Sequence, residues 1–209
     1  MRKSVTAHWR DGWTDRDWSL HASDGQRKYL NKAERGRALA AMRLLSEERR
    51  LFAEVLAWTG ARVSEVLALT PRSFQIDCGL VTIVTLKRRK LSVREVPIPD
   101  DLMAALDRFF SLRRLQMDDS AATRPLWRFC RMTAWRTLKG VMQLAEIAGP
   151  QACPKGLRHA FGIGTLQAGV PLNLTQKWMG HARISTTAIY ADACGPDEAA
   201  FAARFWQFQ

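Results

Sequence analysis

The sequence lacks several features that would define a function at once. Its cysteines, Cys78, Cys130, Cys153 and Cys194, stand far apart, with neither a CxxC pair nor a histidine cluster beside them. This spacing predicts neither a zinc site nor a disulfide framework, so we expect reduced cysteines within the core. A GxxxxGK[ST] loop for nucleotide phosphates and a carboxylate cluster for two metal ions are also missing. Neither a cofactor nor a metal is expected.

Long apolar runs are missing as well. No segment approaches the roughly 20 consecutive apolar residues of a membrane span. The first 18 residues carry charges and three tryptophans without a continuous apolar stretch, which does not resemble a signal peptide. We therefore expect a cytoplasmic protein that does not bind membranes.

Acidic residues are scarce relative to basic ones. The chain has 32 lysines and arginines against 20 aspartates and glutamates, which gives a formal net charge of +12. A field of this sign attracts polyanions and favours a nucleic acid as the partner. On charge alone, a basic protein without a nucleic-acid role is the alternative. The length of 209 residues and the apolar content of 47% predict one main domain.

Apolar residues mostly recur with helical spacing. Two β-branched segments, 80–86 and 93–98, predict strands joined by a cationic hairpin tip at 87–92. Residues 117–125 are polar and small, and they predict a loop. The fold class is therefore mainly α with a small antiparallel β-sheet. Helices are expected at about 31–45, 46–60, 62–69, 99–112, 133–149, 155–167 and 172–179.

The composition divides the chain into three segments. Residues 1–28 predict an N-terminal arm, because their tryptophans are accompanied by too few aliphatic residues for a core. Residues 29–195 are expected to form the main helical domain. Residues 196–209 predict a last helix that begins at Pro196. Its apolar residues Phe201, Phe205 and Trp206 form a stripe that either folds back on the core or docks on a neighbouring protomer.

Arginine, histidine and tyrosine follow one another near the C-terminus, as Arg158, His181 and Tyr190. A tyrosine oxygen can accept a phosphoryl group covalently if cationic donors neutralise the charge on the phosphate oxygens. The planar guanidinium of arginine is well shaped to hold two such oxygens. Arg62 is a second candidate, since it follows a helix-ending glycine, and Glu65 lies one turn later to hold its guanidinium.

In this order, the motifs resemble those of the tyrosine recombinases, the phage-integrase and Xer-like site-specific recombinases. The resemblance covers roughly residues 29–195. Segment 59–65 (TGARVSE) resembles the first arginine box of the family, and segment 155–159 (KGLRH) is similar to the second. Gly180-His181 and Tyr190 resemble the closing motif, with spacing that the family commonly shows. The fold expected from this resemblance is a tyrosine-recombinase-like catalytic domain.

The resemblance implies covalent chemistry on DNA. Tyr190 would attack a scissile phosphate, form a 3′-phosphotyrosyl link and release a 5′-hydroxyl. Arg62, Arg158 and His181 would hold the phosphate. The bond energy is kept in the protein–DNA ester, so rejoining needs no cofactor.

Further roles follow from the hairpin tip and the second box. The family uses a hairpin-tip lysine as general acid toward the leaving oxygen, and Lys87 is preferred over Lys90 because it directly follows the strand. Arg88, Arg89 and His159 are expected to contact DNA.

The sequence departs from the family pattern at two points. Lys155 stands where the family most often has histidine; we assign it to charge stabilisation, because a permanent cation is a poor proton acceptor. Family members also carry an N-terminal helical domain that closes a clamp around DNA, which an arm of this length cannot form. A truncated chain, a partner protein or the arm itself would account for this difference.

The resemblance implies a site-specific recombinase or integrase of a bacterial chromosome or mobile element. It would act as a homotetramer on paired sites and associate with the nucleoid when bound. Two alternatives stay open: a DNA-binding regulator or directionality partner that keeps the fold without turnover, and a type IB topoisomerase-like enzyme.

Overall fold

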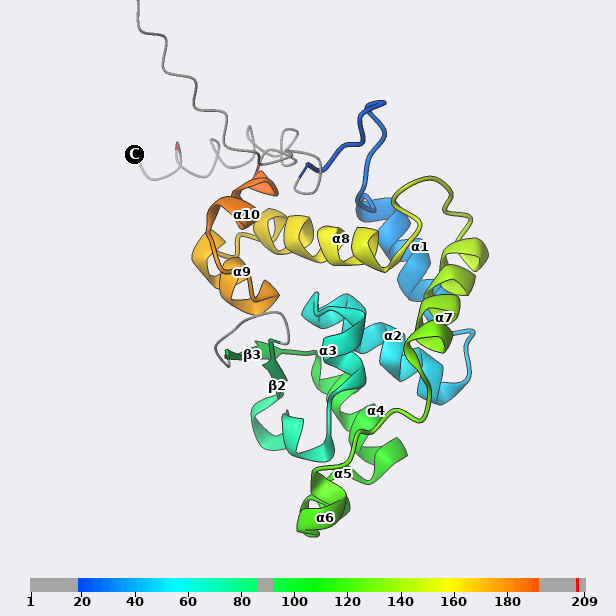
Figure 1. The fold of residues 1–209 in the computed structure, drawn as a ribbon, viewed down its shortest axis with the longest axis vertical. Coiled ribbons are helices and arrows are strands. Elements are labelled where there is room, and N and C mark those ends of the chain that lie inside the picture. Colours follow the sequence, from blue (N-terminus) through cyan, green and yellow to red (C-terminus); the bar gives the residue numbers. More distant parts are fainter. Residues whose placement is uncertain (1–18, 86–91, 192–205, 207–209) are drawn as a thin grey trace, which may run out of the picture.

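The computed structural model describes residues 19–85, 92–191 and 206 (Figure 1). Helices account for most of this part of the chain, together with one small sheet, as expected. The strands are β1 (Phe74–Gln75), β2 (Leu80–Val84) and β3 (Val93–Pro97). The helices are α1 (Lys32–Met42), α2 (Glu47–Thr59), α3 (Val63–Leu67), α4 (Asp100–Phe110), α5 (Leu112–Gln116), α6 (Asp119–Ala122), α7 (Arg131–Leu144), α8 (Pro154–Gln167), α9 (Leu172–Met179) and α10 (Ser185–Ala188).

Capping residues set the limits of α1 and α2. The Asn31 side chain accepts a hydrogen bond from the Glu34 N–H at 2.8 Å, and the Glu34 carboxylate accepts one from the Asn31 N–H at 2.9 Å. This capping box confirms the predicted start of α1. Gly60 ends α2 in a left-handed conformation with φ of 59°. A Cβ at this position would overlap the ring of Phe161, so the glycine also lets α8 approach the end of α2.

The main core lies where α1, α2, α7 and α8 pack together, with α8 lying across the ends of α1 and α2 (Figure 1). Leu51, Phe52 and Leu138 are among its fully buried side chains. Burying each such side chain contributes about 1.5–3 kcal/mol to stability. Phe52 also meets Trp127 edge to face, with ring centroids 5.2 Å apart. This core fixes α2 and α8, the two helices that bracket the candidate site.

The sheet is antiparallel, in the order β1-β2-β3. Val81 pairs with Val96, and both side chains face the core. Arg94 also lies on the buried face of β3, although it is charged. Strand β1 was not predicted, because two residues are too few to show an alternating pattern. The hairpin tip at 86–91 lies outside the described residues.

Several helix limits differ from the prediction. The helix expected at 99–112 is divided, because Ser111 adopts a left-handed conformation with φ of 53° between α4 and α5. Helix α6 lies in the segment expected to be a loop, where Asp118 caps it. Helix α7 begins before Thr133 and ends before Gly149, and the positive φ of Glu146 follows its end. Local backbone conformations of this kind leave little trace in an apolar pattern.

The prediction of core cysteines was wrong for those that the structure describes. Cys78 and Cys130 are exposed, and Cys153 is half-buried. Cys130 and Cys153 are the N-caps of α7 and α8, where the chain lies at the surface. Cys194 lies outside the described residues.

The segment predicted as an arm is partly integrated into the fold. Leu20 is buried in the core, and Arg27 forms an ion pair with Glu34 at 2.8 Å. Residues 1–18 and, apart from Trp206, the predicted C-terminal helix lie outside the described residues. Within the described ranges, none of the helices has the length and hydropathy needed to cross a membrane.

Candidate active site

Tyr190 lies in the turn after α10, and its ring packs against α8. The residue is only 1% exposed. A Cβ on Gly162 of α8 would lie 2.7 Å from the tyrosine ring, so the glycine provides the space that the ring occupies. Burial raises the pKa of Tyr190 to about 12, although the nearby charges of Arg158 and Arg62 act in the opposite direction. The hydroxyl is therefore protonated at neutral pH.

His159, on α8, contacts this hydroxyl. Its Nδ1 lies 3.0 Å from the Tyr190 oxygen. Burial and the positive charges of Lys155 and Arg158 lower the pKa of His159 to about 4, so the ring is neutral at pH 7. We expected His159 to contact DNA; instead its ring is buried against Tyr190. The reason is helical spacing, which places His159 on the inner face of α8, toward the tyrosine.

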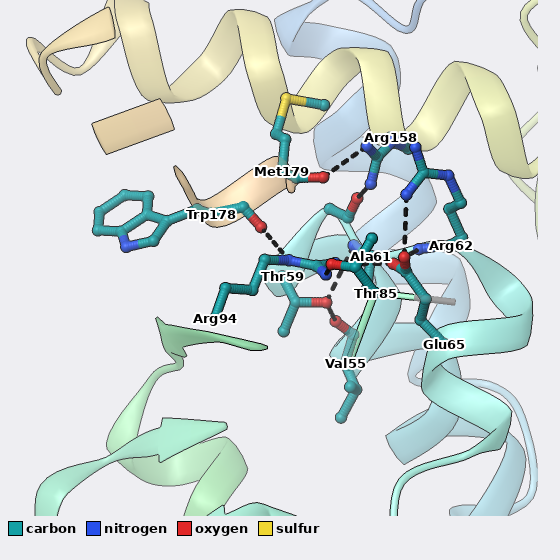
Figure 2. Close-up of polar contacts among 11 residues, drawn as sticks. Val55, Thr59, Ala61, Arg62, Glu65, Thr85, Arg94, Arg158, Trp178 and Met179 are labelled. Atoms are coloured by element: carbon teal, nitrogen blue, oxygen red, sulfur yellow. Dashed lines mark hydrogen bonds and ion pairs between the residues drawn. The ribbon is translucent and has the colours of Figure 1, made fainter. Parts of the chain in front are cut away.

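Arg158 is held by the ends of two helices, as Figure 2 shows. Its guanidinium donates to the carbonyl of Gly60 after α2 and to the carbonyl of Met179 at the end of α9, the latter at 2.7 Å. Carbonyls at helix C-termini lack partners within the helix and so can accept from a side chain. Burial, followed by the positive charge of Arg62, lowers the pKa of Arg158 to about 10. The two arginines therefore share one site.

Arg62 precedes α3 and is oriented by Glu65. The Glu65 carboxylate accepts from the Arg62 backbone N–H and from its Nη1, each at 2.9 Å. The expected contact between the two side chains is thus present. The Arg62 side chain is 27% exposed, whereas that of Glu65 is fully buried. Part of the Arg62 guanidinium is therefore open to solvent, while its contact with Glu65 fixes its orientation.

Arg94 of β3 completes this support and was not predicted from the sequence. Its guanidinium donates to Glu65 at 2.7 Å, to the Thr85 hydroxyl at 2.8 Å and to the Trp178 carbonyl at 2.7 Å (Figure 2). Burial alone would raise the pKa of Glu65, but Arg94 and Arg62 hold it below its usual range. The sequence signal that could have identified Arg94 is its position, because a charged residue there occupies a core-facing place in a strand.

His181 follows the turn at Gly180. Its Nδ1 lies 2.9 Å from the Thr187 hydroxyl, and its ring stacks on that of Tyr190 with centroids 6.1 Å apart. Burial, followed by the charges of Arg158 and Arg62, lowers its pKa to about 3. The sequence-predicted residues Arg62, Arg158, His181 and Tyr190 are therefore brought together.

The other predicted residues lie at the edge of this site or outside the described chain. Lys155 is exposed in the first turn of α8, and its charge acts on His159. Lys87, Arg88, Arg89 and Lys90 fall outside the described residues. Among the residues that the structure does describe, no group of three or more acidic, histidine or cysteine side chains is arranged to hold a metal ion.

The phage integrase family profile matches residues 28–194. Tyrosine recombinase XerD of Brucella abortus biovar 1 is 34% identical over 164 residues, covering 76% of this chain and 50% of the relative. Tyrosine recombinase XerA of Pyrococcus furiosus is 33% identical over 147 residues, covering 68% and 49%. The chain thus spans about half the length of the curated relatives it matches.

Solved structures show the same architecture. A XerA recombinase superposes with a TM-score of 0.66 at 26% identity, over 87% of this chain and 65% of that one. The catalytic domain of bacteriophage HP1 integrase has the same fold, with a TM-score of 0.60 at 23% identity, over 85% and 94%. The expected fold class is thereby confirmed. Because the profile match spans most of the sequence and includes every residue of the site from Arg62 to Tyr190, the chain belongs to the phage integrase family.

Proposed function

We propose that this chain cleaves and rejoins double-stranded DNA as the catalytic part of a site-specific recombinase or integrase. Tyr190 is the nucleophile, and the intermediate is a 3′-phosphotyrosyl ester. The observation that carries the proposal is the position of the Tyr190 hydroxyl beside His159, in a site that also holds two arginines. The positive charges of Arg158 and Arg62 act to lower the pKa of Tyr190, against the larger effect of burial.

The phosphate would be bound by cationic and neutral donors already fixed in place. Arg62 and Arg158 supply guanidinium N–H groups, and His181 supplies an imidazole N–H to a non-bridging oxygen. Donors that need little rearrangement stabilise a developing negative charge more effectively than mobile ones. Lys155, at the exposed start of α8, adds positive charge at the edge of this site.

The leaving 5′-oxygen requires a proton. We assign the role of proton donor to Lys87, with Lys90 as the alternative. Both belong to the tip between β2 and β3. Arg94 supports the assignment, because it ties the base of this hairpin to α3 and α9. Arg88 and Arg89 of the same tip would contact the DNA backbone.

Structural neighbours support DNA as the partner. XerH, which shares the fold at 19% identity and a TM-score of 0.65, is described in complex with its difH substrate. The Tn1549 transposon integrase, at 19% identity and a TM-score of 0.58, is described with transposon right end DNA. We extend this to a homotetramer on paired sites of a chromosome or mobile element.

One observation favours a second function, that of a DNA-binding regulator without turnover. Tyr190 is nearly inaccessible to solvent, so its hydroxyl must meet the phosphate inside the site or after the turn following α10 moves. A protein that never makes this movement would bind DNA without cleaving it.

A nicked suicide duplex separates these functions, because loss of the cleaved fragment traps the covalent intermediate. We expect a protein–DNA species on a denaturing gel from the wild type and from Tyr29→Phe, and none from Tyr190→Phe. DNA retention without such a species would overturn the enzyme proposal in favour of the regulator. Relaxation of plasmids that lack a special site would point instead to topoisomerase activity.

A further inference from the structure

The geometry points to His159 as the group that accepts the proton of Tyr190 when the tyrosine attacks DNA. This inference rests on the proposed function and deepens it. The position at which the family most often has histidine is occupied here by Lys155, so the chain requires another acceptor. His159 lies one helical turn further along α8.

Packing of both residues fixes the contact between His159 and Tyr190. His159 Nδ1 and the Tyr190 oxygen are 3.0 Å apart, and both residues are buried. The space left by Gly162 brings the tyrosine ring against α8, on which His159 also lies. A general base must be within about 2.6–3.2 Å of the proton that it removes, and this pair meets that condition before DNA binds.

Other titratable groups at the site fit this role less well. The ammonium group of Lys155 has no lone pair with which to accept a proton. His181 directs its Nδ1 to the Thr187 hydroxyl at 2.9 Å, and it presents its ring face, at an interplanar angle of 23°, to the Tyr190 ring. Arg158 and Arg62 remain cationic and serve the phosphate.

The tautomer of His159 depends on which atom donates in its contact with Tyr190. Nε2 is buried and, among the described residues, has no hydrogen-bond partner. If the tyrosine O–H donates to Nδ1, that nitrogen is an acceptor and Nε2 carries the ring proton. The ring is neutral because burial and the charges of Lys155, Arg158 and Lys28 depress its pKa. An incoming phosphate offsets these charges, so DNA binding raises the basicity of His159 when it is required.

The proton and electron pairs balance in this step. The Tyr190 oxygen forms a bond to phosphorus while its O–H bond breaks and the proton passes to the Nδ1 lone pair. The bond from phosphorus to the 5′-oxygen breaks, and that oxygen takes a proton from the hairpin lysine or from water. During rejoining the 5′-hydroxyl oxygen forms a bond to phosphorus and returns its proton to the hairpin lysine or to water. The bond from phosphorus to the Tyr190 oxygen breaks, and that oxygen recovers the proton from His159. No oxidant or reductant is involved.

The tautomer can be measured without any turnover. The chain has four histidines, so nitrogen NMR of protein labelled at histidine is tractable, with His159→Asn identifying the signal of interest. At pH 7 we expect His159 to have an unprotonated Nδ1 and a protonated Nε2, and Tyr190→Phe to shift its Nδ1 signal. A protonated Nδ1 would overturn the inference, because that nitrogen would then donate to the tyrosine.

The kinetic test uses the suicide duplex in single-turnover cleavage. Asn places an acceptor oxygen close to the position of Nδ1 but cannot take up a proton, so His159→Asn should cleave about 100-fold more slowly. Its rate should rise with pH where that of the wild type is flat, while DNA retention is unchanged. The matched control is His21→Asn, at an exposed position, which should cleave at the wild-type rate.

A second substrate distinguishes a variant that has lost the general base from one that has lost the general acid. Replacing the 5′-bridging oxygen by sulfur gives a leaving group that needs no proton, so it should rescue Lys87→Ala but not His159→Asn. Cleavage by His159→Asn at the wild-type rate, or its rescue by sulfur, would overturn this inference alone. If the wild type forms no covalent species at all, the proposed function fails and this inference fails with it.

Discussion

Glu65 and Arg94 form an ion pair in which both side chains are buried, at 0% and 3% exposure, with 2.7 Å between Oε2 and Nη2. The other carboxylate oxygen of Glu65 accepts from Arg62 at 2.9 Å. Arg94 in turn reaches the end of β2 and the end of α9. The partly exposed guanidinium of Arg62 is therefore oriented by Glu65, whose carboxylate is itself held by Arg94.

Removing one partner of this buried pair should strongly destabilise the protein. Arg94→Met leaves the Glu65 carboxylate without its buried partner, and such losses destabilise a fold by about 3–5 kcal/mol. Urea denaturation followed by circular dichroism measures this change. Arg113→Met is the matched control, because Arg113 pairs with Asp77 on the surface, and it should barely move the midpoint. Equal effects of the two substitutions would contradict the role assigned to Arg94.

Gly180 should tolerate no side chain. Its φ is 65°, and a Cβ would lie 2.9 Å from Nη1 of Arg94. Gly180→Ala should therefore lower the free energy of unfolding by about 1–2 kcal/mol and slow cleavage, since it disturbs both Arg94 and the adjacent His181. Gly36→Ala is the control: Gly36 lies within α1 with nothing near its Cβ, so thermal unfolding should show a gain of about 0.5–1 kcal/mol. Stabilisation by both substitutions would contradict this account.

Stability should fall in mildly acidic solution because of two buried histidines. The folded-state pKa values of His159 and His181 are lowered to about 4 and about 3, whereas unfolded histidine titrates near 6.5. Above that pH both states are neutral and the contribution is complete. As the pH falls toward 4 the unfolded state takes up protons first, so stability decreases by up to about 1.4 kcal/mol per pH unit for each histidine.

Urea unfolding between pH 7 and 5 measures this slope. The carboxylates with lowered pKa values, Glu34 and Glu65, lose their contribution only at lower pH. The double variant His159→Asn, His181→Asn should therefore flatten the slope, while the exposed His21→Asn should keep it. An unchanged slope in the double variant would show that neither histidine is held neutral.

Arg62 should be needed for cleavage rather than for DNA retention. Lysine keeps the positive charge but loses the planar fork that holds both Glu65 and a phosphate. Arg62→Lys should reduce the single-turnover cleavage rate by about 10²–10³, the usual effect of removing one donor to a developing anion. Filter retention of DNA at moderate salt should change little. Arg72→Lys, at an exposed position paired with Asp119, should cleave normally; a similar loss there would indicate a general effect of charge.

The sequence contained enough information for most helices and for the order of the site residues. Caps such as Asn31 and helix-ending glycines such as Gly60 and Gly180 act locally, so their residue types reveal helix limits directly. The left-handed Ser111 was not predictable, because serine has no strong preference for that conformation. The two-residue strand β1 forms only because β2 lies beside it.

The polar contacts of the site depend on tertiary packing. Arg94 and His159 appear in the sequence as one arginine and one histidine of a basic chain, and neither shows its partner. Glu65 meets Arg94 only once the hairpin packs beside α3, and His159 meets Tyr190 only once the chain returns to α8. Motif order therefore identifies which residues belong to the site, while the folded chain determines what each of them contacts.

The most direct measurement is the identity of the residue that carries DNA after cleavage. The covalent species trapped on the suicide duplex can be digested with nuclease and protease, and its peptides fragmented in a mass spectrometer. We predict a nucleotide joined through its 3′-phosphate to the oxygen of Tyr190. Attachment to Tyr29, the only other tyrosine in the sequence, or to a serine would contradict the account.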